Sequence, residues 1–242
     1  IHTNGSKEDS WDTRSRTDYY SQGLSQGIAI EYAIELSNQL VADPWFCMPH
    51  MADDDYHHQM ARMVLEQLDP ELDVYIEYSN EVWNWGFEQS HYVGENAPGH
   101  NNSYVSDDLR SINPTEYQHP EKDAYMMQRT FRLWQDIFTG ADAERLIRVG
   151  TGQHAWTGNS GRILRYLFKK DDNGNPLTGD RFETSTGAGC DAFAVAGYFS
   201  FKKEEHDAWM AMPPKEVTAD MVIDSVFARF DESSGLWTDE TA

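Results

Sequence analysis

A short polar segment, Asn80 and Glu81 followed by Trp83 and Trp85, contains residue types that suit chemistry on a sugar. A Glu side chain at a strand end can act as a general acid if a partly apolar pocket raises its pKa. Cleavage of a glycosidic bond needs such an acid, and a second carboxylate on the other side of the bond. An amide can bind a sugar hydroxyl, and indole rings pack on the C–H faces of pyranoses. We therefore expect Glu81 and Asn80 to be catalytic and both tryptophans to contact substrate.

Further polar and aromatic side chains follow other runs of strand-like sequence. In parallel sheets, the carboxyl ends of the strands meet at one edge, and that edge is where active sites form. Side chains that come directly after each strand are therefore candidates for substrate binding. These residues are His50, His154, Trp156 and Tyr198.

The elements that would position these residues alternate between helical and strand patterns. Apolar residues at helical spacing predict helices over 26–41, 53–68, 120–138, 161–169 and 215–230. Runs rich in β-branched and aromatic residues predict strands over 45–48, 72–80, 146–150 and 191–198. The stretches 84–119 and 171–189 are rich in glycine or polar residues and are predicted to be loops.

This alternation predicts an α/β fold with parallel strands joined by helical crossovers. Both an open doubly wound sheet and a (β/α)₈ barrel fit the pattern. No glycine-rich phosphate fingerprint follows any of the strands. We expect one catalytic-type domain over residues 1–242.

The strand that ends in Asn80 and Glu81 resembles the fourth strand of retaining glycoside hydrolases with (β/α)₈ barrels, a clan that includes many cellulases. The longer segments 43–50 and 75–85 resemble bacterial cellulase-like proteins of that clan. The resemblance implies that Glu81 is the acid/base and that Asn80 binds substrate beside it. It also implies that His50 is a third-strand polar group and that Tyr198 lies near the nucleophile. The implied reaction is retaining hydrolysis of a β-linked glucan-type polysaccharide.

The same resemblance places the nucleophilic Glu at the end of a seventh strand. By this comparison the four predicted strands are strands three to six of an incomplete barrel. None of the later glutamates, which are Glu204, Glu205, Glu232 and Glu240, ends an apolar strand. We therefore expect the nucleophile to lie outside this chain. The chain would then be part of a longer enzyme, or another chain would complete its barrel, and alone it would be inactive.

Composition narrows the classes of partner. The chain has 242 residues, with 19 Lys and Arg against 41 Asp and Glu, which gives a formal net charge of −22. Nucleic acid is a poor partner for such a surface, because phosphate contacts need Lys and Arg. The sequence has no run of about 18 apolar residues, so no membrane-spanning helix is predicted. The resemblance to cellulase-like proteins implies a secreted or extracellular bacterial protein without a cofactor. From the sequence around them, we expect Cys47 and Cys190 to be buried free thiols.

Two other functions remain open. The first is a non-catalytic carbohydrate-binding barrel, which would keep the tryptophans but not need Glu81. The second is a metal-dependent hydrolase in which Asp54 and His58, about one helical turn apart, share a divalent ion. The simpler interpretation of the aspartates near Asp54 is an acidic helix start. For Glu77, within the predicted strand 72–80, we expect an ion pair with an arginine.

Overall fold

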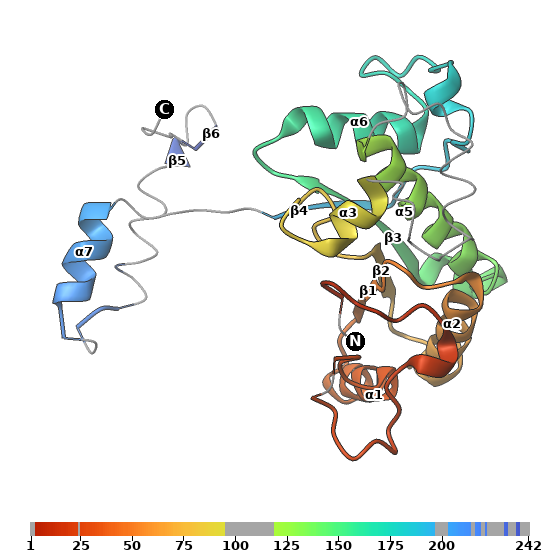
Figure 1. Cartoon of the computed structure of the whole chain (residues 1–242), viewed down its shortest axis with the longest axis horizontal. Coiled ribbons are helices and arrows are strands. Elements are labelled where there is room, and N and C mark those ends of the chain that lie inside the picture. The colour runs from red at the N-terminus through yellow and green to blue at the C-terminus, as the bar shows by residue number, and fades with distance from the viewer. Residues whose placement is uncertain are drawn as a thin grey trace. The chain divides into compact units, whose positions relative to one another are not determined.

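The structure is a computed structural model that describes most of the chain. The described residues are 3–23, 25–94, 119–196, 203–213, 216–218, 221, 230–231 and 236–237. The chain divides into two compact units, Ile1–Ala196 and Gly197–Ala242, which are described separately. The sheet and its helices belong to the first unit (Figure 1). A single domain over the whole chain remains a prediction.

The first unit contains a parallel sheet of four strands in the order β1-β2-β3-β4. A helix lies between each pair of consecutive strands, which confirms the predicted α/β fold with helical crossovers. The barrel remains a prediction. The strands are β1 (Trp45–Met48), β2 (Val74–Tyr78), β3 (Leu146–Gln153) and β4 (Ala192–Ala196).

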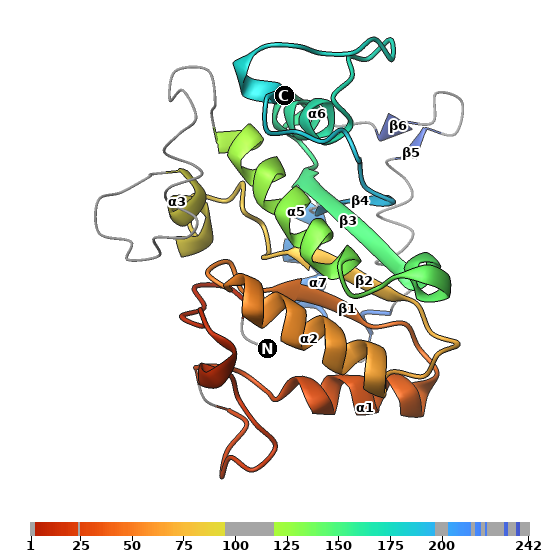
Figure 2. The ribbon, with the colours of Figure 1, turned by 90° about the vertical axis from the view of Figure 1, so that its right-hand side faces the viewer.

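The helices of this unit follow the order of the strands. Helix α1 packs on α2, α2 on α5 and α5 on α6, so that together they form one row. Figure 2 shows α2 and α5 in front of the strands, with α1 beyond α2 and α6 beyond α5. The helices are α1 (Ile30–Leu40), α2 (Asp54–Gln67), α3 (Glu88–Gly94), α5 (His119–Gln135) and α6 (Thr157–Phe168). Short 3₁₀ helices in the described part of this unit are Trp11–Thr13, Gly140–Arg145 and Asp180–Phe182.

The main core lies between this row of helices and the sheet. Every second residue of β1 and β2 points into it, because successive side chains of a strand face opposite sides. Ile76 and Tyr78 of β2 are fully buried there, together with Trp134 of α5. Helix α6 comes very close to β3, where a Cβ at Gly152 would lie 2.4 Å from the Ser160 hydroxyl oxygen. Glycine at this position is therefore what lets the helix pack on the strand.

Several elements differ from their predicted ranges. The stretch 84–119, predicted to be a loop, contains α3, whose residues Gln89, Tyr92 and Val93 are buried. This helix is short and lies between glycines, so its pattern in the sequence is weak. Helix α6 begins at Thr157, although Gly158 and Gly161 disfavour a helix there.

The second unit shows helix α7 (Lys203–Ala211), which the pattern did not predict, and an antiparallel pair of short strands. These strands are β5 (Phe230–Asp231) and β6 (Leu236–Trp237). The predicted helix 215–230 falls mostly outside the described residues. No helix in the described parts of the chain is long and apolar enough to cross a bilayer.

Candidate functional site

The backbone at the carboxyl end of β2 is unusual. Ser79 has φ of 58° and Glu81 has φ of 45°, so two non-glycine residues on either side of Asn80 are left-handed. Such a conformation costs roughly 1–3 kcal/mol per residue and persists only where the surroundings enforce it. The Ser79 amide still donates to the Met48 carbonyl, at 3.0 Å, as the last tie to β1. The strand thus ends in a fixed bend that presents Asn80 and Glu81.

The Glu81 side chain is half-buried and is held by its own loop. The Asn84 side-chain nitrogen donates to a Glu81 carboxylate oxygen at 3.0 Å. The Asn84 oxygen accepts from the Gly86 amide, also at 3.0 Å, and the Asn84 amide donates to the Glu81 carbonyl at 2.8 Å. These bonds fix the position of Asn84, which sequence reasoning did not single out, and through it one oxygen of Glu81.

Of the two tryptophans on this loop, Trp85 is the better placed to contact a ligand. Its side chain is 49 % exposed, whereas Trp83 is half-buried. The indole packs against the His119 ring with centroids 4.8 Å apart, and a Cβ at Gly94 would lie 2.7 Å from it. Burial lowers the pKa of His119 to about 4, so this support is neutral above that pH. Trp85 therefore offers a fixed, half-exposed aromatic surface.

The remaining predicted site residues are placed differently. His50 is only 2 % exposed; its ring meets the Tyr92 ring edge-on, and its carbonyl accepts from the Tyr78 hydroxyl at 3.1 Å. His50 therefore stabilises the carboxyl end of β2 through Tyr78. His154 and Trp156 are exposed at the end of β3, where the Trp156 amide donates to the Gln153 carbonyl. Tyr198 lies outside the described residues.

A second carboxylate, Glu77, lies on the face of β2 that points away from the main core. It is 7 % exposed and accepts hydrogen bonds from the Trp45 indole at 2.8 Å and the Cys47 thiol at 3.4 Å. Burial raises the pKa of Glu77, and the negative charge of Glu81 adds to the rise. No arginine among the described residues pairs with Glu77, so the predicted ion pair is wrong for this part of the chain. Arg148 of the adjoining strand is in register with Ile76, on the core face, and bonds to Asp191 instead.

The aspartates at the start of α2 have structural partners. The Asp53 side chain accepts from the Tyr56 amide and caps the helix, which confirms the acidic helix start. Asp54 pairs with Arg129 at 2.6 Å, while His58 lies 3.3 Å from Asp136. No group of three potential metal ligands occurs in the described ranges. The two cysteines are free, as predicted, but both are half-buried rather than fully buried.

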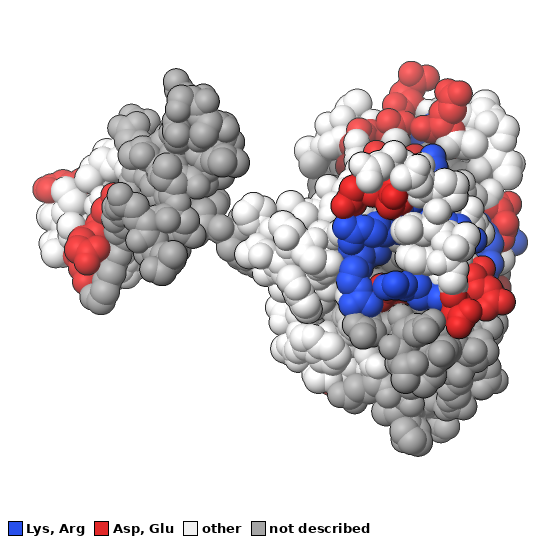
Figure 3. Space-filling model, turned by 90° about the horizontal axis from the view of Figure 1, so that it is seen from above, with Lys and Arg blue, Asp and Glu red and all other residues white. Residues whose placement is uncertain are grey.

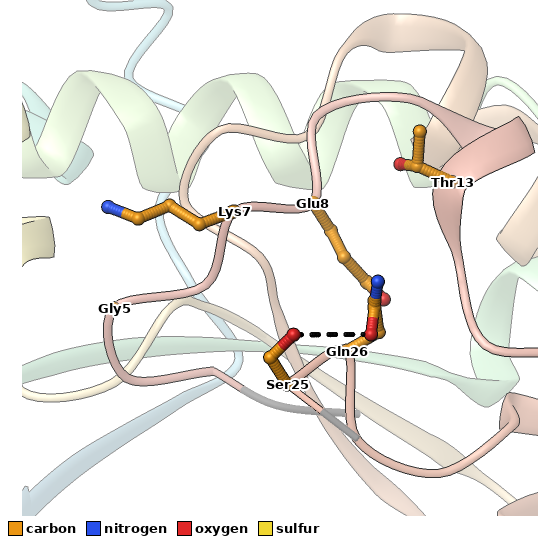
Figure 4. A pocket seen from close by; sticks show the side chains of 6 residues that line it. All are labelled: Gly5, Lys7, Glu8, Thr13, Ser25 and Gln26. Carbon is orange, nitrogen blue, oxygen red and sulfur yellow. Dashed lines mark hydrogen bonds between the residues drawn. The ribbon is translucent and has the colours of Figure 1, made fainter. Parts of the chain in front are cut away.

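Two cavities lie elsewhere among the described residues of the first unit, and neither includes Asn80 or Glu81. One, of about 100 Å³, lies beside the N-terminal segment, with the buried Glu8 side chain directed toward Gln26 (Figure 4). The Tyr56 hydroxyl donates to Glu8 at 2.8 Å, and burial raises the pKa of this carboxyl. The other, of about 390 Å³, is lined by Leu146 at the amino end of β3. Only the second is in the usual size range of ligand pockets.

The surface over α6 differs in charge from the chain as a whole, which is strongly acidic. No acidic residue occurs between Arg145 and Lys170. Figure 3 shows basic and acidic side chains next to one another on the face seen from above. Arg162 pairs with Glu121 and Arg165 pairs with Asp172, so these two arginines of α6 are already matched by carboxylates.

Known proteins give no further guide to this site. No family model, no curated protein and no solved structure matches the chain. The case for a function therefore rests on the residues and on the geometry at the end of β2.

Proposed function

We propose that this chain carries the acid/base half of a retaining glycoside hydrolase that cleaves β-linked glucan-type polysaccharides. One observation supports this most: Glu81 follows a central parallel strand, in a left-handed backbone, with its carboxylate held by Asn84. The carboxyl ends of parallel strands are where α/β enzymes place their active sites. The half-exposed Trp85, four residues further along the same loop, suits a pyranose ring.

In the proposed reaction, Glu81 first gives its proton to the glycosidic oxygen while a second carboxylate attacks the anomeric carbon. The leaving sugar departs as an alcohol, and a glycosyl ester forms. Glu81, now ionised, then takes a proton from water, which displaces the enzyme carboxylate and releases the second sugar. The resemblance to (β/α)₈ hydrolases assigns that carboxylate to a seventh strand, outside the four-stranded sheet. Asn80 binds the 2-hydroxyl, a contact that strengthens in the transition state.

The metal-dependent alternative has less support, because Asp54 and His58 bond to different partners, Arg129 and Asp136. A non-catalytic carbohydrate-binding barrel shares the exposed tryptophans with our proposal. These two differ in what they require of Glu81, since only a hydrolase needs its proton.

The test is Glu81→Gln in a protein that joins this chain to the strand carrying the second carboxylate. Loss of a general acid should lower turnover of β-glucan roughly 10²–10⁴-fold. An aryl glycoside with a good leaving group needs no protonation, so its first step should slow much less. Glucan affinity should stay near wild type. Glu71→Gln, at an exposed carboxylate before β2, is the matched control.

Unchanged turnover in Glu81→Gln would refute the assignment. Glucan binding by a wild-type protein that has no turnover would favour the carbohydrate-binding barrel. This chain alone should bind β-glucan oligosaccharides without hydrolysing them.

A further inference from the structure

Three side-chain amides from distant parts of the chain meet at Asn80. The Asn80 side-chain nitrogen donates to the Asn4 side-chain oxygen at 2.9 Å. The Gln89 nitrogen donates to the same Asn4 oxygen at 2.8 Å and to the Asn80 carbonyl at 2.7 Å. The Gln89 oxygen accepts from the Gly5 amide at 3.1 Å. The network thus joins the N-terminal segment, the end of β2 and helix α3.

The backbone atoms of this network settle which way each amide faces, although nitrogen and oxygen of an amide look alike in shape. The Gly5 amide can only donate, so the Gln89 atom facing it is the oxygen. The other Gln89 atom is then the nitrogen, as its bond to the Asn80 carbonyl requires. The Asn4 atom that meets this nitrogen must be an oxygen. The Asn80 atom that meets the Asn4 oxygen must therefore be its nitrogen.

We infer that Asn4 and Gln89 are positioning residues for Asn80, so that the N-terminal segment is part of the candidate site. With one N–H committed to Asn4, Asn80 keeps one N–H and its side-chain oxygen in a fixed direction for a ligand hydroxyl. The inference rests on the proposed function for its purpose, but its geometry can be tested separately.

The two ends of the network differ in burial, so that Gln89 is held rigidly whereas Asn4 can be substituted. Gln89 is fully buried, and both N–H groups and the oxygen of its amide are used. Loss of a partner would leave a buried polar group unsatisfied, at a cost of about 1–3 kcal/mol. Asn4, in contrast, is exposed, so water can reach the donors that Asn4→Ala would free; this change should therefore cost less and leave the fold intact. The same segment is also tied to α3 by an ion pair between Lys7 and Glu88.

These contacts define three matched variants. Asn4→Ala removes the shared acceptor of Asn80 and Gln89. Asn4→Asp keeps an oxygen acceptor for both donors, so it should restore the network. Lys7→Ala breaks a different tie of the same segment, the ion pair with Glu88, and leaves the acceptor in place.

The first measurement needs no ligand: the ¹H–¹⁵N signals of the Asn80 side chain, assigned with Asn80→Asp. In the wild type the two protons should be well separated, because one is bonded to Asn4. We expect the separation between the two proton signals to become smaller in Asn4→Ala and to stay as in the wild type in Asn4→Asp and Lys7→Ala. Unchanged signals in Asn4→Ala would overturn the inference.

The second measurement is affinity for cellohexaose by calorimetry. Asn4→Ala should bind roughly five- to tenfold more weakly, the effect of about one hydrogen bond. Asn4→Asp and Lys7→Ala should bind like wild type. Equal losses in Asn4→Ala and Lys7→Ala would overturn a specific role for Asn4. A wild type that does not bind cellohexaose would contradict the proposed function, and the Asn80 signals would still decide the positioning.

Discussion

The two faces of strands β1 and β2 are built from different kinds of side chain. The face toward the helices carries only apolar or aromatic residues, each at most 3 % exposed: Phe46, Met48, Val74, Ile76 and Tyr78. The opposite face carries Trp45, Cys47, Tyr75 and Glu77 in the intervening positions. There Trp45 is 48 % exposed and stacks on Tyr75, while a carboxyl group is buried beside a thiol.

This difference separates the part of the sheet that maintains the fold from the part available for function. The helix face gains stability from excluded water, which depends on apolar area and close packing. The opposite face accepts a buried carboxyl, which costs stability unless its hydrogen bonds repay it. The unfavourable group, Glu77, thus lies in β2, and the candidate catalytic group, Glu81, follows the end of the same strand.

The largest effect should come from the helix face. Ile76→Ala removes a fully buried side chain between β2 and α5, and such truncations cost about 2–5 kcal/mol. Urea denaturation should show this as a lower midpoint with an unchanged slope. Val195→Ala, at a side chain that is 45 % exposed on the edge strand β4, is the matched control and should lose far less. Equal losses at both positions would show that the helix face is not the main source of stability.

A smaller effect is expected from Trp45→Phe on the opposite face. Phenylalanine keeps an aromatic ring next to Tyr75 but removes the N–H that donates to Glu77. A buried carboxyl that loses one of its two donors should destabilise the protein by about 1–3 kcal/mol. Trp156→Phe, at an exposed tryptophan outside the sheet, should be close to neutral. A neutral Trp45→Phe would mean that the indole bond contributes nothing net.

The sequence was sufficient to predict the strands and helices that form the apolar face of the sheet. Periodicity alone predicted four parallel strands with helices between them, because buried faces repeat every two residues in strands and about every 3.6 in helices. It failed for α3, whose seven residues are too few to show a helical period. It also started α6 too late, since Gly158 and Gly161 mask a helix that packing on β3 stabilises.

The polar half was only partly accessible to sequence reasoning. Strand ends identified Asn80, Glu81 and Trp85, because position after a strand can be read from the pattern. The partners Asn4 and Gln89 could not be identified, since they lie 76 and 9 residues from Asn80 and no local pattern links them. The prediction of an arginine beside Glu77 failed for a similar reason. The register of β2 and β3 places Arg148 on the core face, and this register depends on strand pairing that no local pattern shows.

The third prediction concerns pH and has the opposite sign from the first two. Burial raises the pKa of Glu77 in the folded protein above its value of about 4.3 in the unfolded chain. The folded state therefore binds more protons between these two pKa values, and stability falls as pH rises through that window. Glu77→Gln keeps an acceptor for the Trp45 indole without the charge. It should be more stable than wild type at pH 7 and equal to it below pH of about 4.

Urea titrations at both pH values measure this difference. The control is Glu66→Gln, an exposed position on α2, which should show no such dependence on pH. Cys47, Glu81 and Asp123 are the other titratable groups that interact with Glu77, so each should keep its residue type in the comparison. A wild type that is more stable than Glu77→Gln at pH 7 would contradict the account, because the ionised carboxylate would then be favourably paired.

The smallest effect should come from Cys47→Ser, one residue from the core yet on the opposite face. The thiol is half-buried and donates to Glu77, and a serine hydroxyl can make the same bond more strongly. The lost sulfur contacts and the better donor should nearly cancel, which leaves a change within about 0.5 kcal/mol. Met48→Ser, at the next residue but fully buried in the core, should instead unfold much more readily. A large loss in Cys47→Ser would show that this face is packed as tightly as the helix face, and the contrast between the two faces would fail.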